Sequence, residues 1–284
     1  MKKRMDMNRI AQISIFVIIA VFLVGGVLIT FFLFSGKFSY SSDFKQETNN
    51  IRSSVFNCFK IVSKESLNYV GKQGGYSREP LSYYLDTGFY SIPFYYFDNE
   101  ILIPSNEYVS NEVAYDFDSR RSRCLDFISG SGFNYLVNYR NSNVTMGPGK
   151  IIIHNDMDLI LNKGNQSTKI SFNDLPIDID SKFYEMKNFA SYIVYSSLIS
   201  NQSLCMDCFS ELASNLEFNL EIDNQYKGVL IIDILSNNTD ASPFDFRFLM
   251  TNTVSDTVPN VLNVLVSKNK YNPTGNLNIT APKF

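Results

Sequence analysis

The sequence predicts an α+β fold in which an N-terminal transmembrane helix precedes an extracytoplasmic domain of helices and mostly antiparallel sheet. Three observations lead to this prediction. Residues 15–34 form an apolar run without a charge. Apolar residues recur at helical spacing in later segments, and short alternating runs between Asn, Asp, Gly and Lys are typical of strands. Because these strands do not alternate regularly with helices, α+β is favoured over a doubly wound sheet.

The apolar run is long enough to span the roughly 30 Å of bilayer hydrocarbon. Basic residues precede it, so the positive-inside rule places the N-terminus in the cytoplasm and residues 37–284 outside. A removable signal peptide is the alternative, but its apolar core should be shorter and small residues should mark its cleavage site. We therefore predict a basic leader over 1–11, a transmembrane helix over 12–36, and the lipid bilayer as a partner.

Residues 9–16 read Arg-Ile-Ala-Gln-Ile-Ser-Ile-Phe and lead directly into the apolar run. This arrangement resembles the class III signal sequence of archaeal type IV pilins. The resemblance implies a peptidase cut between Ala11 and Gln12, after which the helix would pack into a filament core. That family usually has Glu five residues into the mature chain, where this sequence has Phe16, and the difference bears on filament assembly more than on anchoring.

Two later blocks, 58–76 with its Gln-Gly-Gly-Tyr ending and 232–248, resemble segments of uncharacterised membrane-anchored archaeal proteins. This second resemblance implies no activity.

Two helices and a Tyr-rich hairpin are predicted for the first part of the ectodomain, 37–132. An apolar stripe begins at Ile51, and the helix that carries it ends at Gly71 and Gly74. A second helix is predicted over 107–129, with Ser105 or Asn106 as its N-cap. Between the two helices, the aromatic segment before Asp98-Asn99 and the apolar segment after it predict a hairpin.

The second part, 133–284, is predicted to be β-rich, with helices over 181–200 and 204–214. The strands are predicted at 135–139, 150–154, 157–161, 168–172, 176–180, 216–222, 228–235 and 243–250, with 261–266 as an additional candidate.

The four cysteines fit an oxidising compartment. Cys58 and Cys124 lie on the apolar faces of the two predicted helices, where a disulfide would join them. Cys205 and Cys208 form a C-x-x-C motif. A structural disulfide, local or exchanged with the first pair, is the main interpretation of this motif, and a redox motif or a thiolate zinc site are the alternatives. Four cysteines allow three pairings, and the sequence does not choose among them.

Composition and motifs exclude several function classes. A net charge of −3 without a basic domain argues against nucleic acid as a partner. One histidine, His154, leaves no Ser-His-Asp arrangement of the usual kind and few histidine zinc sites, and it fits a strand end better than a metal site. Phosphate-binding and metalloprotease motifs do not occur. We predict no catalytic residue, no metal site and no cofactor.

Three other features have both a structural and a functional interpretation. Of three Asp pairs, the two in predicted strands, Asp156/Asp158 and Asp178/Asp180, could each present two carboxylates to calcium or to a sugar, although a solvated strand face is the simpler interpretation. The basic cluster is expected on an exposed helix face, with an anionic surface as the alternative partner. The aromatic hairpin could line the core or form a binding patch. These features comprise Asp116, Asp118, Asp156, Asp158, Asp178 and Asp180; Arg120, Arg121 and Arg123; and Tyr90, Tyr95 and Tyr96.

The leading functional hypothesis is a single-pass, membrane-anchored cell-surface protein with a structural, adhesive or assembly role, and a pilin-like subunit is one form of it. Its partners would be other copies of the chain or other surface proteins. One alternative is an exported thiol-disulfide oxidoreductase or thiol metal protein that uses Cys205 and Cys208. Another is a ligand-binding ectodomain that uses the Tyr-rich hairpin.

Overall fold

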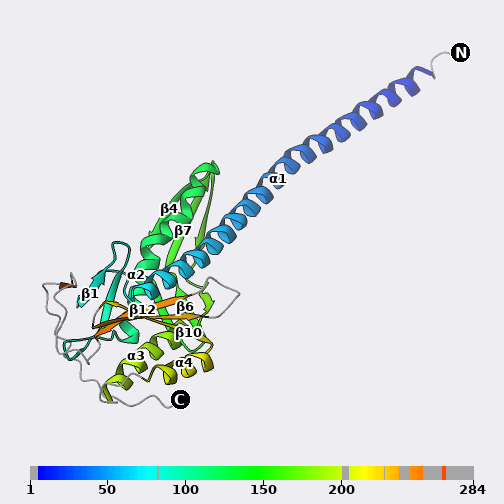
Figure 1. The fold of residues 1–284 in the computed structure, drawn as a ribbon. Helices are drawn as coiled ribbons and strands as arrows, with labels where there is room; N and C mark the ends of the chain where they lie inside the picture. The colour runs from blue at the N-terminus through cyan, green and yellow to red at the C-terminus, as the bar shows by residue number, and fades with distance from the viewer. Residues whose placement is uncertain are drawn as a thin grey trace. The chain divides into compact units, whose positions relative to one another are not determined.

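The chain has an α+β fold with a mixed sheet, shown in Figure 1. This computed structural model describes residues 6–81, 83–199, 205–226, 228–236, 244–251 and 264–266, and the side chains of these residues except 6–19, 31–42, 225–226 and 264–266. The chain divides into two units, Met1–Ser54 and Val55–Phe284. Each unit is described by itself, and the second contains every strand given below.

Helix α1 (Asp6–Lys72) includes the apolar run near its start. Among the residues that the structure describes, no helix is long and apolar enough to cross a bilayer. The predicted transmembrane helix over 12–36 is therefore wrong, and so is the first element of the predicted fold class. The side chains of Ala11 and Gln12 lie outside the described residues, and the processing site there stays a prediction.

The largest sheet has the strand order β10-β11-β12-β2-β1-β13, with β3 beside β2. Strands β2 and β12 run parallel, and the other neighbours in this sheet run antiparallel. The parallel pair joins segments from both sides of the predicted division at 132/133, so these two parts share one sheet. The strands are β1 (Tyr83–Asp86), β2 (Ser91–Phe97), β3 (Glu100–Ile101), β10 (Phe218–Tyr226), β11 (Val229–Ser236), β12 (Asp245–Thr251) and β13 (Val264–Val266).

Two three-stranded antiparallel sheets come from the middle of the chain. Their orders are β4-β7-β8 and β5-β6-β9. The strands are β4 (Asn134–Tyr139), β5 (Asn143–Gly147), β6 (Lys150–His154), β7 (Met157–Lys163), β8 (Gln166–Ser171) and β9 (Ile177–Asp180). Strands β1 and β5 are absent from the sequence prediction, because both are short and β1 lies inside a continuous aromatic segment.

Four further helical segments accompany α1 in the described part of the chain. They are α2 (Asn106–Arg120), the 3-10 segment η1 (Arg121–Gly130), α3 (Phe183–Ile199) and α4 (Met206–Asn215). The helix predicted over 107–129 is thus an α-helix that tightens into a 3-10 segment. Ser105 caps α2, because its hydroxyl oxygen accepts a hydrogen bond from the Tyr108 N–H.

Asp98 and Asn99 form the turn predicted between β2 and β3. Both residues have positive φ angles, 48° and 63°, as a type I′ hairpin turn requires. Strand β2 is buried on both faces. On one face Ile92 and Phe94 belong to a core cluster, and on the other Tyr95 stacks on Phe248 of β12 with ring centroids 4.7 Å apart. Strand β2 is therefore the centre of the core.

The Gln-Gly-Gly-Tyr segment after α1 attaches the helix to this central strand. Gln73 is buried, and its side-chain carbonyl accepts a hydrogen bond from the Ser91 N–H at 3.0 Å. The Tyr95 hydroxyl donates to the Gly74 carbonyl at 3.1 Å. Gly74 has φ +53°, and a Cβ there would lie 2.6 Å from both the Arg247 carbonyl oxygen and the Pro93 ring. Only glycine satisfies both the backbone angle and the close approach.

We expect Gly74→Ala to lower the free energy of unfolding by about 3 kcal/mol, from backbone strain and from overpacking against β2 and β12. The matched control is Gly88→Ala. Gly88 also has a positive φ, +80°, but nothing lies within 4 Å of the added Cβ, so only the backbone cost of about 1 kcal/mol applies. Urea unfolding measures both. Equal losses in the two variants would contradict the close approach at Gly74.

Candidate functional site

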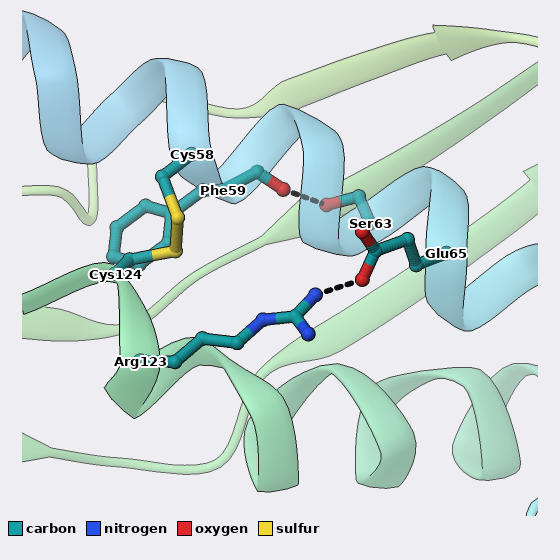
Figure 2. The surroundings of a disulfide bond; sticks show 6 residues. All are labelled: Cys58, Phe59, Ser63, Glu65, Arg123 and Cys124. Atoms are coloured by element: carbon teal, nitrogen blue, oxygen red, sulfur yellow. Dashed lines mark hydrogen bonds and ion pairs between the residues drawn. A yellow bond between two sulfur atoms is a disulfide. The ribbon is translucent and has the colours of Figure 1, made fainter.

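The Cys58–Cys124 disulfide joins α1 to η1, as Figure 2 shows. Its Cα atoms are 5.6 Å apart, and the cysteines are separated by 66 residues in sequence. Cys124 is buried, and Cys58 is half-buried. Closing a loop of this length restricts the unfolded chain and stabilises the fold by about 4 kcal/mol in the chain-entropy view. The predicted disulfide between these helical faces is confirmed.

The surroundings of this disulfide combine aromatic packing with an ion pair. Phe59 is fully buried and packs edge-on against Phe117 and Phe172, with ring centroids 6.0 and 5.3 Å away. Arg123 forms an ion pair with Glu65 of α1 on the exposed side. The covalent link and the ion pair hold α1 to η1, and the rings hold it to α2 and to Phe172 after β8.

The Cys205–Cys208 disulfide lies in a different environment. Cys205 is the N-cap of α4, Cys208 lies in the first turn, and both are exposed. Phe209 anchors the turn, because it is buried and its ring meets Tyr192 edge-on at 6.2 Å. With two disulfides formed, the structure contains no free cysteine.

The three arginines of the basic cluster do not form one exposed face. Arg120 pairs with Asp116 at 2.6 Å, and its guanidinium lies over the Tyr69 ring. Arg121 is 4% exposed. The sequence interpretation as a solvated helix face is wrong at this residue.

Arg121 holds two loops and a strand end in place. Its guanidinium donates to the Ser142 hydroxyl, the Asn155 side-chain carbonyl and the Arg140 backbone carbonyl, at 3.0, 2.6 and 2.6 Å. It also lies 3.0 Å from an Asp118 carboxylate oxygen. Burial lowers the pKa of Arg121, and Asp118 acts in the opposite direction. A buried guanidinium whose two terminal nitrogens bond to this many acceptors organises the polypeptide around it.

Glu112 of α2 is a second buried charge that the sequence did not reveal. It is 1% exposed and accepts hydrogen bonds from the Ser77 N–H at 2.9 Å and the Ser77 hydroxyl at 2.6 Å, and it pairs with Arg78. Burial alone would raise the pKa of Glu112, but the hydrogen bonds from Arg78 and Ser77 outweigh burial and hold the pKa below its ordinary value. Glu112 therefore fixes the segment that leaves α1.

The aspartate pairs face basic side chains. Asp158 lies 3.0 Å from the Lys169 amine, Asp156 lies 3.2 Å from Arg140, and Asp178 lies 3.1 Å from Lys150. In the part of the chain that the structure describes, no group of three or more His, Cys, Asp or Glu side chains could hold a metal ion. His154 is exposed at the end of β6.

The aromatic residues of the predicted binding patch do not form one surface. Tyr95 is 0% exposed, and Tyr96 is 5% exposed with its hydroxyl bonded to the Asn99 side chain. Tyr90 is half-buried near Tyr69 and Lys72. The predicted binding patch of Tyr90, Tyr95 and Tyr96 is therefore wrong, because β2 is buried on both faces.

Lys187 of α3 is buried among apolar residues, with 6% exposure. Burial lowers its pKa from 10.5 to about 8, and no acidic group among the described residues contributes to the shift. The sequence contains a signal for this burial: Lys187 lies four residues after Phe183 and three before Ala190, on the apolar face of α3.

Comparison with protein-family models, with curated proteins and with solved structures finds no match to this chain. Most of the polar groups described above hold elements of the fold together. The Cys205–Cys208 bond, in contrast, is exposed to solvent.

We expect Lys187→Met to raise the free energy of unfolding at pH 7 by about 3 kcal/mol, the equivalent of the pKa difference between the unfolded and folded states. Below pH 8 the native protein bears the full cost of a buried ammonium. This cost disappears as the pH rises from about 8 to 10.5, because the folded state then releases its proton first. Urea unfolding should show a large difference in the free energy of unfolding between the variant and wild type at pH 7, and a small difference at pH 10. A pH-independent difference would contradict the prediction.

Proposed function

We propose that the chain is a non-catalytic surface protein of an oxidising, extracytoplasmic compartment, with a structural, adhesive or assembly role. The observation that carries the proposal is the pairing of all four cysteines in disulfides, one of them between helices 66 residues apart in sequence. Disulfides persist outside the cytosol and are rare within it.

The arrangement of the charged residues also supports a structural role. Arg121, Glu112 and Arg123 each connect segments that are distant in sequence. Such buried or covalently supported connections maintain a shape outside the cell, where chaperones and ATP do not repair it. A protein used as a scaffold or adhesin benefits from this kind of stability.

The state of the cysteines in the native protein tests this proposal. Cells are treated with a membrane-permeant alkylating agent before lysis, and the protein is then digested without reductant and analysed by mass spectrometry. We expect no alkylated cysteine, and peptides linked through Cys58–Cys124 and Cys205–Cys208. Alkylated Cys58 and Cys124 would overturn the proposed compartment. Protein reduced before alkylation provides the control for labelling of all four positions.

Thiol-disulfide exchange is a second candidate function, and the exposure of both Cys205 and Cys208 at the start of α4 favours it. A thiolate of a partner dithiol would attack one sulfur and form a mixed disulfide. The second partner thiol would then resolve it, leaving Cys205 and Cys208 as thiols and the partner oxidised. The partner loses the two electrons that this pair gains.

Equilibration in glutathione buffers of increasing reducing strength tests this second candidate. We expect Cys205–Cys208 to be reduced in buffers that leave Cys58–Cys124 intact, because Cys124 is buried and closes a far longer loop. Alkylation followed by peptide mass measurement reports each bond separately, so Cys58–Cys124 is the internal control. If both bonds require the same reducing strength, the exchange function is excluded.

A further inference from the structure

Strand β4 is an edge strand whose sequence is symmetric about Leu136. In the sheet β4-β7-β8 it has one neighbour, β7. The residues from Asn134 to Asn138 read Asn-Tyr-Leu-Val-Asn, with Asn at both ends and one large apolar or aromatic residue on each side of Leu136. The strand contains no charge, no proline and no irregularity of register with β7. It thus lacks the charge, the proline and the bulge that prevent edge-to-edge pairing in many edge strands.

Charged side chains lie on the other edge strands whose side chains are described, except β5. Lys169 lies on β8, Asp178 on β9 and Glu221 on β10. Strand β5 is also uncharged; α2 lies against β5, and η1, which precedes β4 in the chain, lies against β4. Among these edges, β4 combines an uncharged sequence with an exposed apolar side chain.

The outward backbone groups of β4 follow from its register. The Arg140 N–H donates to the Asp156 carbonyl at 3.0 Å, and this pair continues the β4–β7 register, in which Leu136 faces Ile160. Since hydrogen-bonded pairs alternate in an antiparallel ladder, even-numbered residues of β4 bond to β7. Tyr135 and Val137 therefore direct their N–H and C=O groups away from the sheet, and no described residue bonds to them.

Leu136 lies on the solvent face of the sheet and is 64% exposed. Beside it on the same face is Ile160 of β7, which is half-buried and faces Lys169 of β8. Asn134 and Asn138 flank Leu136 on this face. The solvent face of β4 is thus polar except for one apolar side chain at the centre of symmetry.

We propose that two copies of the chain pair antiparallel through their β4 strands, with the two-fold axis at Leu136. Tyr135 then faces Val137 of the second copy as a hydrogen-bonded pair, so the two symmetric pairs use the outward N–H and C=O groups in four hydrogen bonds. Leu136 faces Leu136 of the second copy as a non-hydrogen-bonded pair, the kind of pair in which side chains approach most closely. The result is a six-stranded sheet with a continuous apolar row of Ile160 and Leu136 from each copy.

The inference rests on the assembly role proposed above and names the partner surface as a second copy of this chain. The register of the pairing is specific. A shift by one residue would place the outward N–H and C=O groups of one β4 strand opposite residues of the other whose backbone groups already bond to β7. An axis at Leu136 satisfies both the hydrogen bonds and the meeting of like side chains.

Cysteine cross-linking of the full chain tests the register. In Leu136→Cys the two new sulfurs meet at a pair whose Cα atoms are about 4.5 Å apart, close enough for a disulfide. We expect mild oxidation to give a covalent dimer of twice the 32.4 kDa chain mass, with a mapped 136–136 link. Asn134→Cys alone should stay monomeric on a non-reducing gel, and its mixture with Asn138→Cys should cross-link.

Ile160→Cys is the control for non-specific oxidation. It lies on the same face but one strand inward in each copy, so its two sulfurs would be about 14 Å apart. Absence of the 136–136 link, or equal cross-linking at 160, would overturn the pairing. Alkylation of the native cysteines before lysis does not depend on this pairing, so unlabelled Cys58 and Cys124 in that experiment would leave the compartment proposal standing after such a failure.

Val137→Pro gives an independent measurement without a new cysteine. The Val137 N–H faces outward, so proline removes a donor to the second copy and spares the ladder with β7. We expect the dissociation constant of the dimer, measured by sedimentation equilibrium, to rise about tenfold or more. The thermal unfolding midpoint of the dissociated chain should stay unchanged. Self-association that persists unchanged in Val137→Pro would also overturn the proposal, because it would arise from another surface.

Discussion

The close approach of the chain after α1 to strands β2 and β12 is the constraint on which the rest of the structure depends. Gly71 and Gly74 permit it, since a Cβ at these positions would lie 2.3 Å from the Asp245 carbonyl oxygen and 2.6 Å from that of Arg247. The approach places the end of α1 against the parallel pair of β2 and β12, which joins segments about 150 residues apart in a single core. Phe183 of α3 packs on Phe246 at the same place, with ring centroids 5.5 Å apart.

Each polar network described above serves this arrangement from a different side. Glu112 binds the segment that leaves α1. Arg121 connects the start of η1 to the loop between β4 and β5 and to the loop between β6 and β7. The disulfide at Cys58 adds a covalent link at the opposite end of the helix segment. Charged groups in this fold thus act mainly as connectors between elements, which explains why so many of them are buried or paired.

Local features were largely predictable from the sequence. The turn at Asp98 and Asn99, the cap at Ser105, most of the strands and both later helices follow from periodicity and turn chemistry, which depend on near neighbours only. Non-local features were not. The parallel pairing of β2 with β12, the burial of Arg121 and Glu112, and the covering of Tyr95 depend on segments up to about 150 residues away, and no local pattern encodes them. The transmembrane helix predicted over 12–36 was inferred from the apolar run alone, and no helix among the described residues is long and apolar enough to cross a bilayer.

The partnership of β2 with β12 has a consequence for the synthesis of the chain. Because ribosomes deliver residues in order, β2 emerges more than 150 residues before the strand that covers its edge. Until then Phe94 lacks Leu249 of its core cluster, and Tyr95 lacks the rings of Phe246 and Phe248. The Cys58–Cys124 bond can form while the sheet is still open. The early disulfide would link α1 to η1 before β12 is made, so it stabilises the partly synthesised chain as well as the finished fold. Proteins with such distant pairings fold slowly and expose apolar strands meanwhile.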